Sequence, residues 1–364
     1  MKILVVSNMY PSDKDPVYGT FVRSFVEGVI DRNIGGKCEL VAIRGKRFGV
    51  TAKILAYIEF YSKLTWQLLF NEYDLVYVHT VTFPILPIRF VSLFRRLPLV
   101  FNVHGDDVLP GTRLKKWLKN QAAKILPKAK LVVAPSAYFR NVVLREFPGV
   151  RRENVFVSPS GGVDECFFVG KRDDFSDNRP FVSGFVSRID QGKGWDLFVK
   201  AVSKLREEGV DCRGVMVGRG AESDKLQSLI RELGMESHIS YLGAVEHERL
   251  PEIYGSFDLL IFPTEREAES LGLVGLEAMA AGVPVIAGNI GGPSSYVRDG
   301  ENGYLFTPGD YKELVSKVNA YLALDNGSKK SISSAAYQTA CSYQKSKVND
   351  QLYDKLLAIT SGNE

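Results

Sequence analysis

Two glutamates lie eight positions apart in the stretch ESLGLVGLE, which runs from Glu269 to Glu277, and the small residues of AMAAG follow them. A pair of carboxylates is what a glycosidase uses, and its two acids lie within about 10 Å of each other. A wholly helical segment of this length would place the two α-carbons about 12 Å apart. Flexible side chains shorten that gap only partly, so the spacing disfavours two acids acting on one bond.

The segment between the two glutamates favours anion binding instead. The apolar run at 258–264 predicts a buried strand, a polar loop follows, and we expect a helix to begin near Gly272, with Leu273 and Val274 in its first turn. The first amides of a helix lack intrahelical partners and bind phosphate groups. This arrangement suits a long ligand with an anionic middle and hydroxyl groups at both ends, such as a nucleotide-diphosphate sugar. The structural alternative is that one glutamate is stabilised by the helix dipole and the other is an exposed surface acid. Each would then contribute under about 1 kcal/mol to stability.

Two cations follow another predicted strand. Arg188 and Lys193 lie in VSRIDQGKG, at and after the end of the apolar run 181–188. Charge-assisted hydrogen bonds from both side chains would neutralise a diphosphate. Together with a helix N-terminus they would replace the Mg²⁺ of other phosphate enzymes, and the sequence has no Asp-x-Asp-like element in an obvious metal position. We therefore expect no metal site, and the alternative for both residues is a solvated loop.

Length and composition are those of a globular enzyme. The chain has 364 residues, of which 45% are hydrophobic and 24% charged, and this length predicts about two domains. No run approaches the roughly 20 apolar residues of a membrane helix, and the first residues resemble a buried strand more than a signal peptide. The four cysteines are scattered without metal-like spacing. We therefore expect reduced thiols and a cytoplasmic protein.

Each half of the chain alternates short apolar runs with longer amphipathic segments, which predicts an α/β protein with two doubly wound, Rossmann-like parallel sheets facing each other across a cleft. We expect a first domain at 1–172, a polar linker at 171–180 and a second domain at 178–344. A last helix at 345–364 is expected to pack back on the first domain. The expected strands lie at 2–7, 75–79, 99–104, 130–136, 181–188, 213–220, 239–243, 258–264 and 284–288, and the expected helices include 19–30, 48–70, 113–126, 195–209, 222–234 and 271–282.

The stretch ESLGLVGLEAMAAGVPVIAGNIGGPSSYVRDGENGYLFTPGD resembles the signature segment of the retaining GT-B enzymes of glycosyltransferase family 4, whose hallmark is two glutamates separated by seven residues. VSRIDQGKG resembles the phosphate loop of the family, VGRGAESDKLQ its next strand–turn–helix, and ISYLGAV its nucleobase strand. SNMYPSDKDPVYGTFV and VHGDD resemble its first-domain loops, so the resemblance covers essentially the whole chain. Ser270 and Leu271 depart from the Gly-Phe of many members, and the single Gly19 departs from the paired glycines of some.

The resemblance implies a GT-B fold and a retaining, metal-independent, hexosyltransferase-type enzyme. Such an enzyme moves a sugar from a nucleotide-diphosphate sugar to an acceptor hydroxyl, in bacterial-type surface polysaccharide or glycolipid assembly. It needs no cofactor, because the nucleotide sugar is a substrate, its acceptor is a glycan or a lipid-linked glycan, and nucleic acid is not a partner. The donor-binding residues that it implies are Gly19, Arg188, Lys193, Leu242, Glu269, Gly272, Leu273, Val274 and Glu277, and the catalytic residues are His104, Arg188, Lys193 and Glu269.

His104 is the candidate from the first domain. It ends the apolar run at 99–104, where its imidazole would hydrogen-bond the transferred sugar or the reacting phosphate. A polar histidine at the end of a strand is more often structural, and the family resemblance is what favours the functional role. His79 ends the preceding predicted strand and is a weaker candidate.

The net charge of +4 is unevenly distributed, because residues 1–170 carry 24 Lys and Arg against 14 Asp and Glu. Basic amphipathic segments next to aromatic residues, such as RLKKWLK with Lys115, Lys116 and Lys119, predict attraction to an anionic membrane surface. We therefore expect peripheral association at the inner face of the membrane. The alternative is that these segments are ordinary helices that face the core.

Two other functions remain open at this point. One is a sugar-phosphate synthase or phosphorylase-like enzyme of the same fold, which a phosphate-bearing acceptor or a cofactor lysine would mark. The other is a nucleotide-sugar-binding scaffold without turnover. The presence of Glu269, Arg188 and Lys193 argues against the scaffold.

Overall fold

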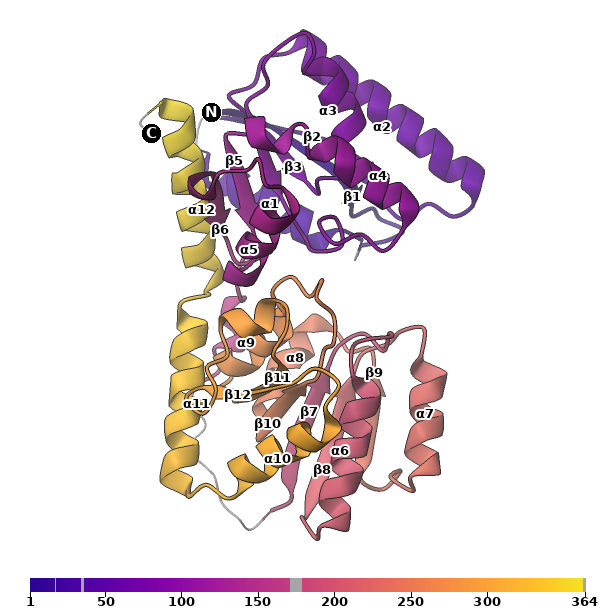
Figure 1. Cartoon of the computed structure of the whole chain (residues 1–364), viewed down its shortest axis with the longest axis vertical. Helices are drawn as coiled ribbons and strands as arrows, with labels where there is room; N and C mark the ends of the chain where they lie inside the picture. Colours follow the sequence, from indigo (N-terminus) through magenta and orange to yellow (C-terminus); the bar gives the residue numbers. More distant parts are fainter. Residues whose placement is uncertain (17, 34–35, 171–178, 363–364) are drawn as a thin grey trace. The chain divides into compact units, whose positions relative to one another are not determined.

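A computed structural model describes residues 1–16, 18–33, 36–170 and 179–362. These residues form two compact units, one of Met1–Gly161 with Val348–Glu364 and one of Gly162–Lys347 (Figure 1). The linker expected at 171–180 lies outside the described residues except for its last two positions. Each unit is a parallel sheet covered by helices on both faces, so the predicted fold of two Rossmann-like domains is confirmed.

The sheet of the first unit has the order β2-β1-β3-β4-β5-β6, and all its strand pairs are parallel. The chain leaves β1 toward β2 on one side and later returns to β3 on the other. A doubly wound sheet binds ligands where its strand order reverses in this way, which is here between β1 and β3. The strands are β1 (Lys2–Tyr10), β2 (Lys37–Arg44), β3 (Leu75–His79), β4 (Leu99–Asn102), β5 (Leu131–Ala134) and β6 (Val155–Val157).

Alternate residues of β1 send apolar side chains to the two faces of this sheet, as strand geometry requires. Leu4 and Val6 pack in the core beneath α2 (Val50–Phe70), α3 (Ile85–Val91), α4 (Arg113–Ala122) and α5 (Ala137–Glu146). Ile3 and Val5 pack on the other face, beneath α1 (Thr20–Arg32) and α12 (Lys345–Ser361). The first unit is therefore a three-layered sandwich (Figure 1). Two 3₁₀ turns, Leu126–Lys128 and Arg152–Asn154, complete it.

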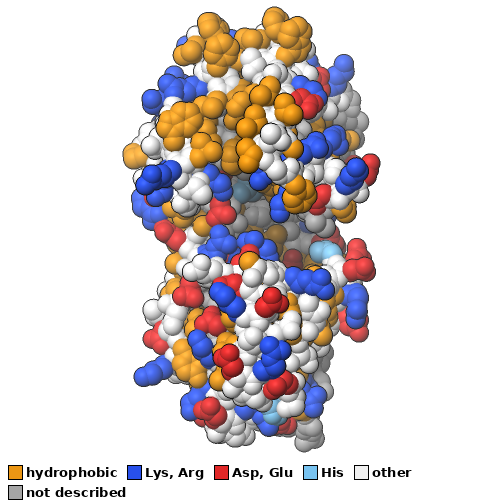
Figure 2. All heavy atoms as spheres, turned by 90° about the vertical axis from the view of Figure 1, so that its right-hand side faces the viewer, with side chains coloured by type: hydrophobic (Ala, Val, Ile, Leu, Met, Phe, Trp, Pro, Cys, Tyr) orange, Lys and Arg blue, Asp and Glu red, His pale blue; other side chains and the backbone are white. Residues whose placement is uncertain are grey.

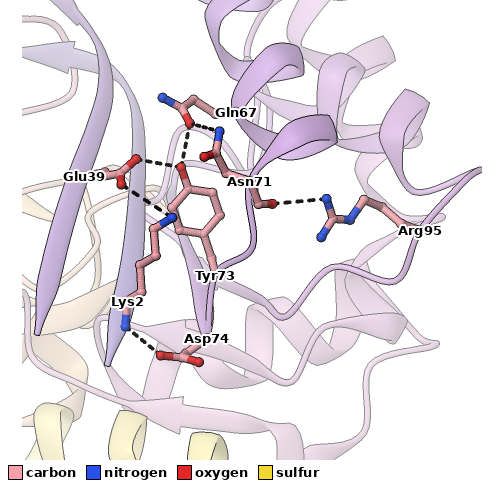
Figure 3. A network of polar contacts seen from close by, with 7 residues as sticks. All are labelled: Lys2, Glu39, Gln67, Asn71, Tyr73, Asp74 and Arg95. Atoms are coloured by element: carbon pink, nitrogen blue, oxygen red, sulfur yellow. Dashed lines mark hydrogen bonds and ion pairs between the residues drawn. The ribbon is translucent and has the colours of Figure 1, made fainter.

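A polar network fixes the C-terminal end of α2 (Figure 3). The Arg95 guanidinium donates hydrogen bonds of 3.0, 3.0 and 3.1 Å to the last carbonyls in and after the helix, at Leu68, Leu69 and Asn71. These carbonyls have no partner within a helix, and a cation there also complements the helix dipole. The Tyr73 hydroxyl lies 2.8 Å from Glu39 on β2 and 2.7 Å from Gln67 on α2, which ties the helix to the edge of the sheet.

The sheet of the second unit has the order β12-β11-β10-β7-β8-β9 and is also parallel, with its strand order reversing between β7 and β10. Its strands are β7 (Phe181–Val186), β8 (Cys212–Val217), β9 (Ile239–Gly243), β10 (Leu259–Phe262), β11 (Val285–Gly288) and β12 (Gly303–Phe306).

Helices cover both faces of the second sheet as well. One core lies under α6 (Trp195–Glu207), α7 (Ser223–Glu232) and α10 (Tyr311–Leu322), and the other under α8 (Leu250–Gly255), α9 (Leu273–Ala280) and α11 (Asn326–Cys341). Short 3₁₀ turns lie at Glu165–Phe167, His247–Arg249 and Gly292–Ser295. None of the described helices is long and apolar enough to cross a membrane.

Helix α12 belongs to the core of the first unit although it ends the chain. Leu352 and Leu356 are buried in the same apolar cluster as Ile3 and Val5 on β1. An ion pair of 2.7 Å joins Asp350 on α12 to Arg32 at the end of α1. The first unit therefore requires the last helix for one face of its core.

We expect Leu356→Ala to lower the free energy of unfolding of the first unit by about 2–5 kcal/mol, because a fully buried leucine leaves a cavity behind. The neighbouring Leu357, which is 39% exposed, provides a matched control, and Leu357→Ala should cost under about 0.5 kcal/mol. Urea denaturation of the full chain measures both. Equal costs for the two substitutions would contradict the packing of α12.

Candidate active site

The two loops that carry the predicted donor residues follow neighbouring strands of the second unit. Strands β7 and β10 pair in parallel, with Ser183 opposite Leu259, so the loops after them leave the sheet at the same edge. The loop after β7 carries Arg188 and Lys193, and the loop after β10 carries Glu269. The strand order reverses between these two strands, and ligands of doubly wound sheets bind at this place.

A buried ion pair joins the two loops. Lys193 Nζ lies 2.5 Å from Glu269 Oε2, and the two side chains are only 10% and 13% exposed. The Thr264 hydroxyl donates to the same carboxylate oxygen at 3.3 Å. The pairing compensates two charges that would be costly to bury alone. The sequence predicts both as donor-binding residues, and the structure adds that they contact each other.

The backbone around Glu269 is held by a neighbouring turn. The amide of Gly292 donates to the carbonyl of Glu269 at 2.7 Å, and the amide of Glu269 donates to the carbonyl of Arg266 at 3.0 Å. Gly292 begins a 3₁₀ turn that follows β11, so a third loop at the same sheet edge positions the glutamate. The sequence alone does not predict this support of Glu269.

Helix α9 begins at Leu273, which confirms the helix start expected near Gly272. Gly272 precedes the helix with φ of 76°, and a Cβ added there would lie 2.5 Å from a ring carbon of Phe262. Only glycine meets both conditions without strain. The hydroxyl of Tyr296 donates to the Gly272 carbonyl at 2.8 Å, and half-buried Leu273 and Val274 form the first turn. The chain thus presents free helix amides directly after the loop of Glu269.

Glu277 lies in the second turn of α9, in surroundings unlike those of Glu269. The Tyr254 hydroxyl donates to Glu277 Oε2 at 2.8 Å. Burial raises the pKa of Glu277, and the hydrogen bond from Tyr254 offsets part of that rise. Tyr254 itself is fully buried, and burial together with Glu277 raises the pKa of its phenol, so it stays a neutral donor. Sequence analysis did not single out Tyr254, because a buried tyrosine on a short helix carries no motif.

The remaining predicted donor residues of this unit are more exposed. The Arg188 side chain is 64% exposed and lies 2.8 Å from Asp190 in its own loop. Leu242 is 48% exposed on β9, the edge strand that lies two strands from β7. The structure therefore gathers Lys193, Glu269 and the start of α9 around the reversal point and places Leu242 farther along the same edge.

In the first unit the two candidate histidines contact each other. His79 ends β3 and His104 follows β4, with His79 Nδ1 3.2 Å from His104 Nε2. The ring of Phe21 lies 4.6 Å from the His104 ring, between centroids. Gly19 is the residue before α1, with φ of 78°, and a Cβ there would lie 2.9 Å from the Met9 carbonyl carbon. Gly19 therefore allows the loop after β1 to approach the strand closely.

Asp107 holds the two histidine-bearing loops in place. Its carboxylate accepts the backbone amide of His104 at 2.9 Å and that of Val81 at 3.0 Å, and the residue is 5% exposed. One side chain thereby joins the loops after β3 and β4. Thr80, directly before Val81, has φ of 70°, which is uncommon for a β-branched residue and is retained where surrounding contacts enforce it. The sequence alone does not predict this role of Asp107.

The two imidazoles are neutral at pH 7. Burial lowers the pKa of His79 well below its ordinary value, and the neighbouring His104 lowers it further. Burial also lowers the pKa of His104, although Asp107 opposes that shift. His79 Nε2 has no hydrogen-bond partner among the described residues. We infer that the shared proton lies on His79 Nδ1, because the opposite tautomer would bury an N–H without an acceptor. His104 Nδ1 then carries a proton that it can donate.

No group of three or more His, Cys, Asp or Glu side chains in the described parts of the chain is arranged to hold a metal ion. Independence from metal remains a prediction, because it concerns the reaction and not the free protein. All four cysteines are free thiols.

The buried histidine pair predicts a pH dependence of stability. Below the ordinary histidine pKa of about 6.5, the unfolded chain binds protons that the folded His79 does not, so the free energy of unfolding falls as the pH falls. We expect His79→Phe, whose ring would join those of Phe25 and Tyr77, to lose less stability than the wild type between pH 7.5 and 5.5. Urea denaturation at both pH values measures the difference. His238→Gln, in the other unit, should keep the pH dependence of stability of the wild type. The same pH dependence in His79→Phe would contradict the prediction that buried His79 causes it.

Two family models match this chain. The model described as Glycosyltransferase Family 4 matches residues 21–164, and the model described as Glycosyl transferases group 1 matches residues 171–339. The alpha-D-kanosaminyltransferase of Streptomyces kanamyceticus is 30% identical over 273 residues, which cover 70% of this chain and 69% of that protein. A GDP-mannose-dependent alpha-(1-6)-phosphatidylinositol monomannoside mannosyltransferase of Mycolicibacterium smegmatis is 32% identical over 62% of this chain and 61% of its own length.

Solved structures share the fold along almost the whole chain. HepE of Anabaena in complex with UDP superimposes with a TM-score of 0.76 at 23% identity, over 98% of this chain and 100% of that one. The lipopolysaccharide outer core galactosyltransferase WaaB superimposes with a TM-score of 0.77 at 15% identity, over 98% and 99% of the two chains. These likenesses establish the GT-B fold. Together with the two family models and the 30% identical relative, they show that the chain belongs to glycosyltransferase family 4 and is a GT-B glycosyltransferase.

Proposed function

We propose that the enzyme moves a sugar from a nucleotide-diphosphate sugar to an acceptor hydroxyl with retention at the anomeric carbon. The observation that carries this proposal is the clustering of Lys193, Glu269 and the first turn of α9 where the strand order of the second sheet reverses. A cation, a hydrogen-bond acceptor and free helix amides are the groups that a sugar diphosphate needs. HepE, which has the same fold, has been solved with UDP and with UDP-glucose, so uridine-diphosphate sugars are the first donors to test.

The Lys193–Glu269 pair gives donor binding a simple exchange of partners. A diphosphate would take over the Lys193 ammonium, and a hydroxyl of the transferred sugar would donate to the Glu269 carboxylate. The diphosphate would then compensate the Lys193 charge, and the Glu269 carboxylate would accept hydrogen bonds from the sugar and from the Thr264 hydroxyl.

The proposed reaction is a front-side displacement. The bond from the anomeric carbon to the diphosphate oxygen breaks, and the acceptor oxygen forms its bond on the same face. The acceptor proton passes to the departing phosphate oxygen, so no protein nucleophile takes part. Arg188, Lys193 and the α9 amides stabilise the charge that develops on the diphosphate, without a metal ion. His104 Nδ1–H is proposed to donate a hydrogen bond to the transferred sugar.

We propose a glycan or a lipid-linked glycan as acceptor, in the assembly of surface polysaccharide or glycolipid. Two relatives support this choice by what they act on, a phosphatidylinositol mannoside in one case and the lipopolysaccharide outer core in the other. A D-inositol 3-phosphate glycosyltransferase of Nocardia farcinica, 33% identical over 62% of this chain, makes a phosphate-bearing acceptor the alternative to test.

Incubating the purified enzyme with UDP- and GDP-sugars tests the proposal, with donor hydrolysis and anomeric configuration followed by NMR. We expect consumption of one donor, a first product with the anomeric configuration of that donor, and no loss of rate in excess EDTA. Adding sugar phosphates as acceptors distinguishes the proposed enzyme from the alternative that uses a phosphate-bearing acceptor. An inverted first product would refute retention, and a rate lost to EDTA and restored by Mg²⁺ would refute the metal-free mechanism. Donor binding without any turnover would indicate a nucleotide-sugar-binding scaffold and not an enzyme.

The two glutamates should respond differently to removal. Glu277→Ala should weaken binding of the free nucleoside diphosphate by about 1.5–3 kcal/mol, because a charged hydrogen bond to the ribose is lost. Glu269→Ala should leave that affinity unchanged or raise it, because Lys193 loses its competing partner, and it should lower turnover instead through lost orientation of the sugar. Calorimetry and donor kinetics measure both effects. Glu265→Ala, at an exposed position of the same loop, is the control, and identical profiles for the two glutamate variants would exclude separate roles.

A further inference from the structure

The helices α2, α3 and α4 carry apolar side chains on the side that faces away from their sheet. On α2 these include Ile54, Ile58, Trp66 and Phe70, which are 54% to 65% exposed. The inward side of the same helix buries Phe60, Leu64 and Leu68. A helix that is apolar on two opposite sides has more apolar surface than its own core uses, and this predicts a second partner.

The neighbouring elements extend this surface. Phe90 at the end of α3 and Phe94 just after it are 50% and 69% exposed, and on α4 Leu114 and Trp117 are 61% and 49% exposed. Exposed aromatic rings lie against each other, with centroids 4.3 Å apart for Trp66 and Phe70. The space-filling view shows hydrophobic side chains gathered over the first unit, with Lys and Arg around them (Figure 2). We call the outward side of α2, α3, α4 and the turn after α3 the helical apolar surface.

Side-chain contacts join these three helices into one layer. The Arg89 guanidinium on α3 donates to Gln121 on α4, and Arg95 donates to the last carbonyls of α2 (Figure 3). The Tyr61 hydroxyl on α2 donates to the Phe83 carbonyl just before α3 at 2.9 Å. Because these contacts fix the helices to one another, the exposed rings are displayed on a preformed surface and need no folding transition on binding.

The segments that form the helical apolar surface contain many Lys and Arg and almost no Asp or Glu. Residues 44–70 contain five Lys and Arg and only one acid, Glu59, which pairs with Lys63 at 2.6 Å. Residues 89–96 and 113–119 contain three and four Lys and Arg and no acid. Arg96, Arg113 and Lys116 are exposed, whereas Lys119, expected from the sequence to contribute to a basic surface, turns inward to an ion pair with Glu146.

We propose that the helical apolar surface docks on an anionic phospholipid bilayer, with its aromatic side chains at the headgroup–acyl boundary and its cations among the headgroups. Trp at such a boundary and Lys or Arg beside anionic lipids are the side chains that this environment favours. A protein partner would need a core depleted in charge, whereas exposed cations here lie on α2, on α4 and in the turn after α3. This inference goes beyond the proposed transfer reaction and does not depend on it, because none of these residues belongs to the donor site.

Sedimentation with vesicles tests the proposal. We expect the full chain to bind vesicles of equal parts phosphatidylcholine and phosphatidylglycerol at least tenfold more tightly than phosphatidylcholine alone, since each cation near an anionic surface contributes about fivefold. The double substitution Trp66→Glu with Phe70→Glu should weaken this binding at least tenfold. Leu357→Glu, at a position 39% exposed on α12 at the other face of the same sheet, should bind like the wild type. Circular dichroism checks that all variants are folded.

The tryptophans provide a second measurement. The chain has three, of which Trp66 and Trp117 lie on the helical apolar surface and Trp195 is 8% exposed in the second unit. Lipids brominated on their acyl chains should quench the emission of the wild type, because interfacial helices bury their apolar side about 5–10 Å into the bilayer. The variant Trp66→Phe with Trp117→Phe, which keeps only Trp195, should not be quenched.

Two results would overturn the proposal. One is equal vesicle binding by the wild type and the Trp66→Glu, Phe70→Glu variant. The other is a dimer in vesicle-free solution that the same variant dissociates, which would assign the surface to a second copy of the chain. Donor hydrolysis by these variants should equal that of the wild type. Absence of hydrolysis in every variant and the wild type would count against the proposed reaction while leaving the membrane result intact.

Discussion

A buried ammonium and a buried carboxylate, 76 residues apart in the chain, hold the centre of the second unit together. Lys193 and Glu269 come from loops after two strands that lie side by side only because the strand order reverses there. A doubly wound sheet leaves an opening at that edge, and polar groups in it must satisfy one another or a ligand. The pair therefore joins the two loops and compensates both buried charges.

The first unit meets the same constraint with a carboxylate that binds backbone amides and with two imidazoles that contact each other. Asp107 there connects the loops after β3 and β4 through backbone amides, and the two histidines pair as uncharged imidazoles. Burial lowers the pKa of both rings, so this edge offers hydrogen bonds rather than charge.

The sequence was sufficient for the strands inside each sheet, because these are buried on both faces and appear as continuous apolar runs. The sequence pattern did not predict β2, β6 or β12, which are all edge strands. Half-buried β2 carries a lysine, a glutamate and an arginine among its apolar residues, and β6 has only three residues, so neither produces a clear pattern.

The site shows a similar division between what is local and what is not. The motif predicted Glu269, Glu277 and the helix start between them, because these lie within one short stretch of chain. It could not predict Tyr254, Asp107 or the support of Glu269 by Gly292, since each makes a contact between segments remote in sequence. The basic first half likewise suggested electrostatic attraction to a membrane, but only the structure shows which apolar side of α2 is left over after the core has been filled.

The two glutamates of one short motif end in opposite electrostatic surroundings, and this difference indicates what each can bind. Glu269 faces an ammonium and a threonine hydroxyl, so its charge is compensated before any ligand arrives. Glu277 has a neutral phenol for a partner, and burial raises its pKa, so its ionised form is short of hydrogen-bond donors. Two vicinal ribose hydroxyls would supply such donors without adding charge. These different surroundings are the reason for proposing that Glu277 binds the ribose hydroxyls and Glu269 the transferred sugar.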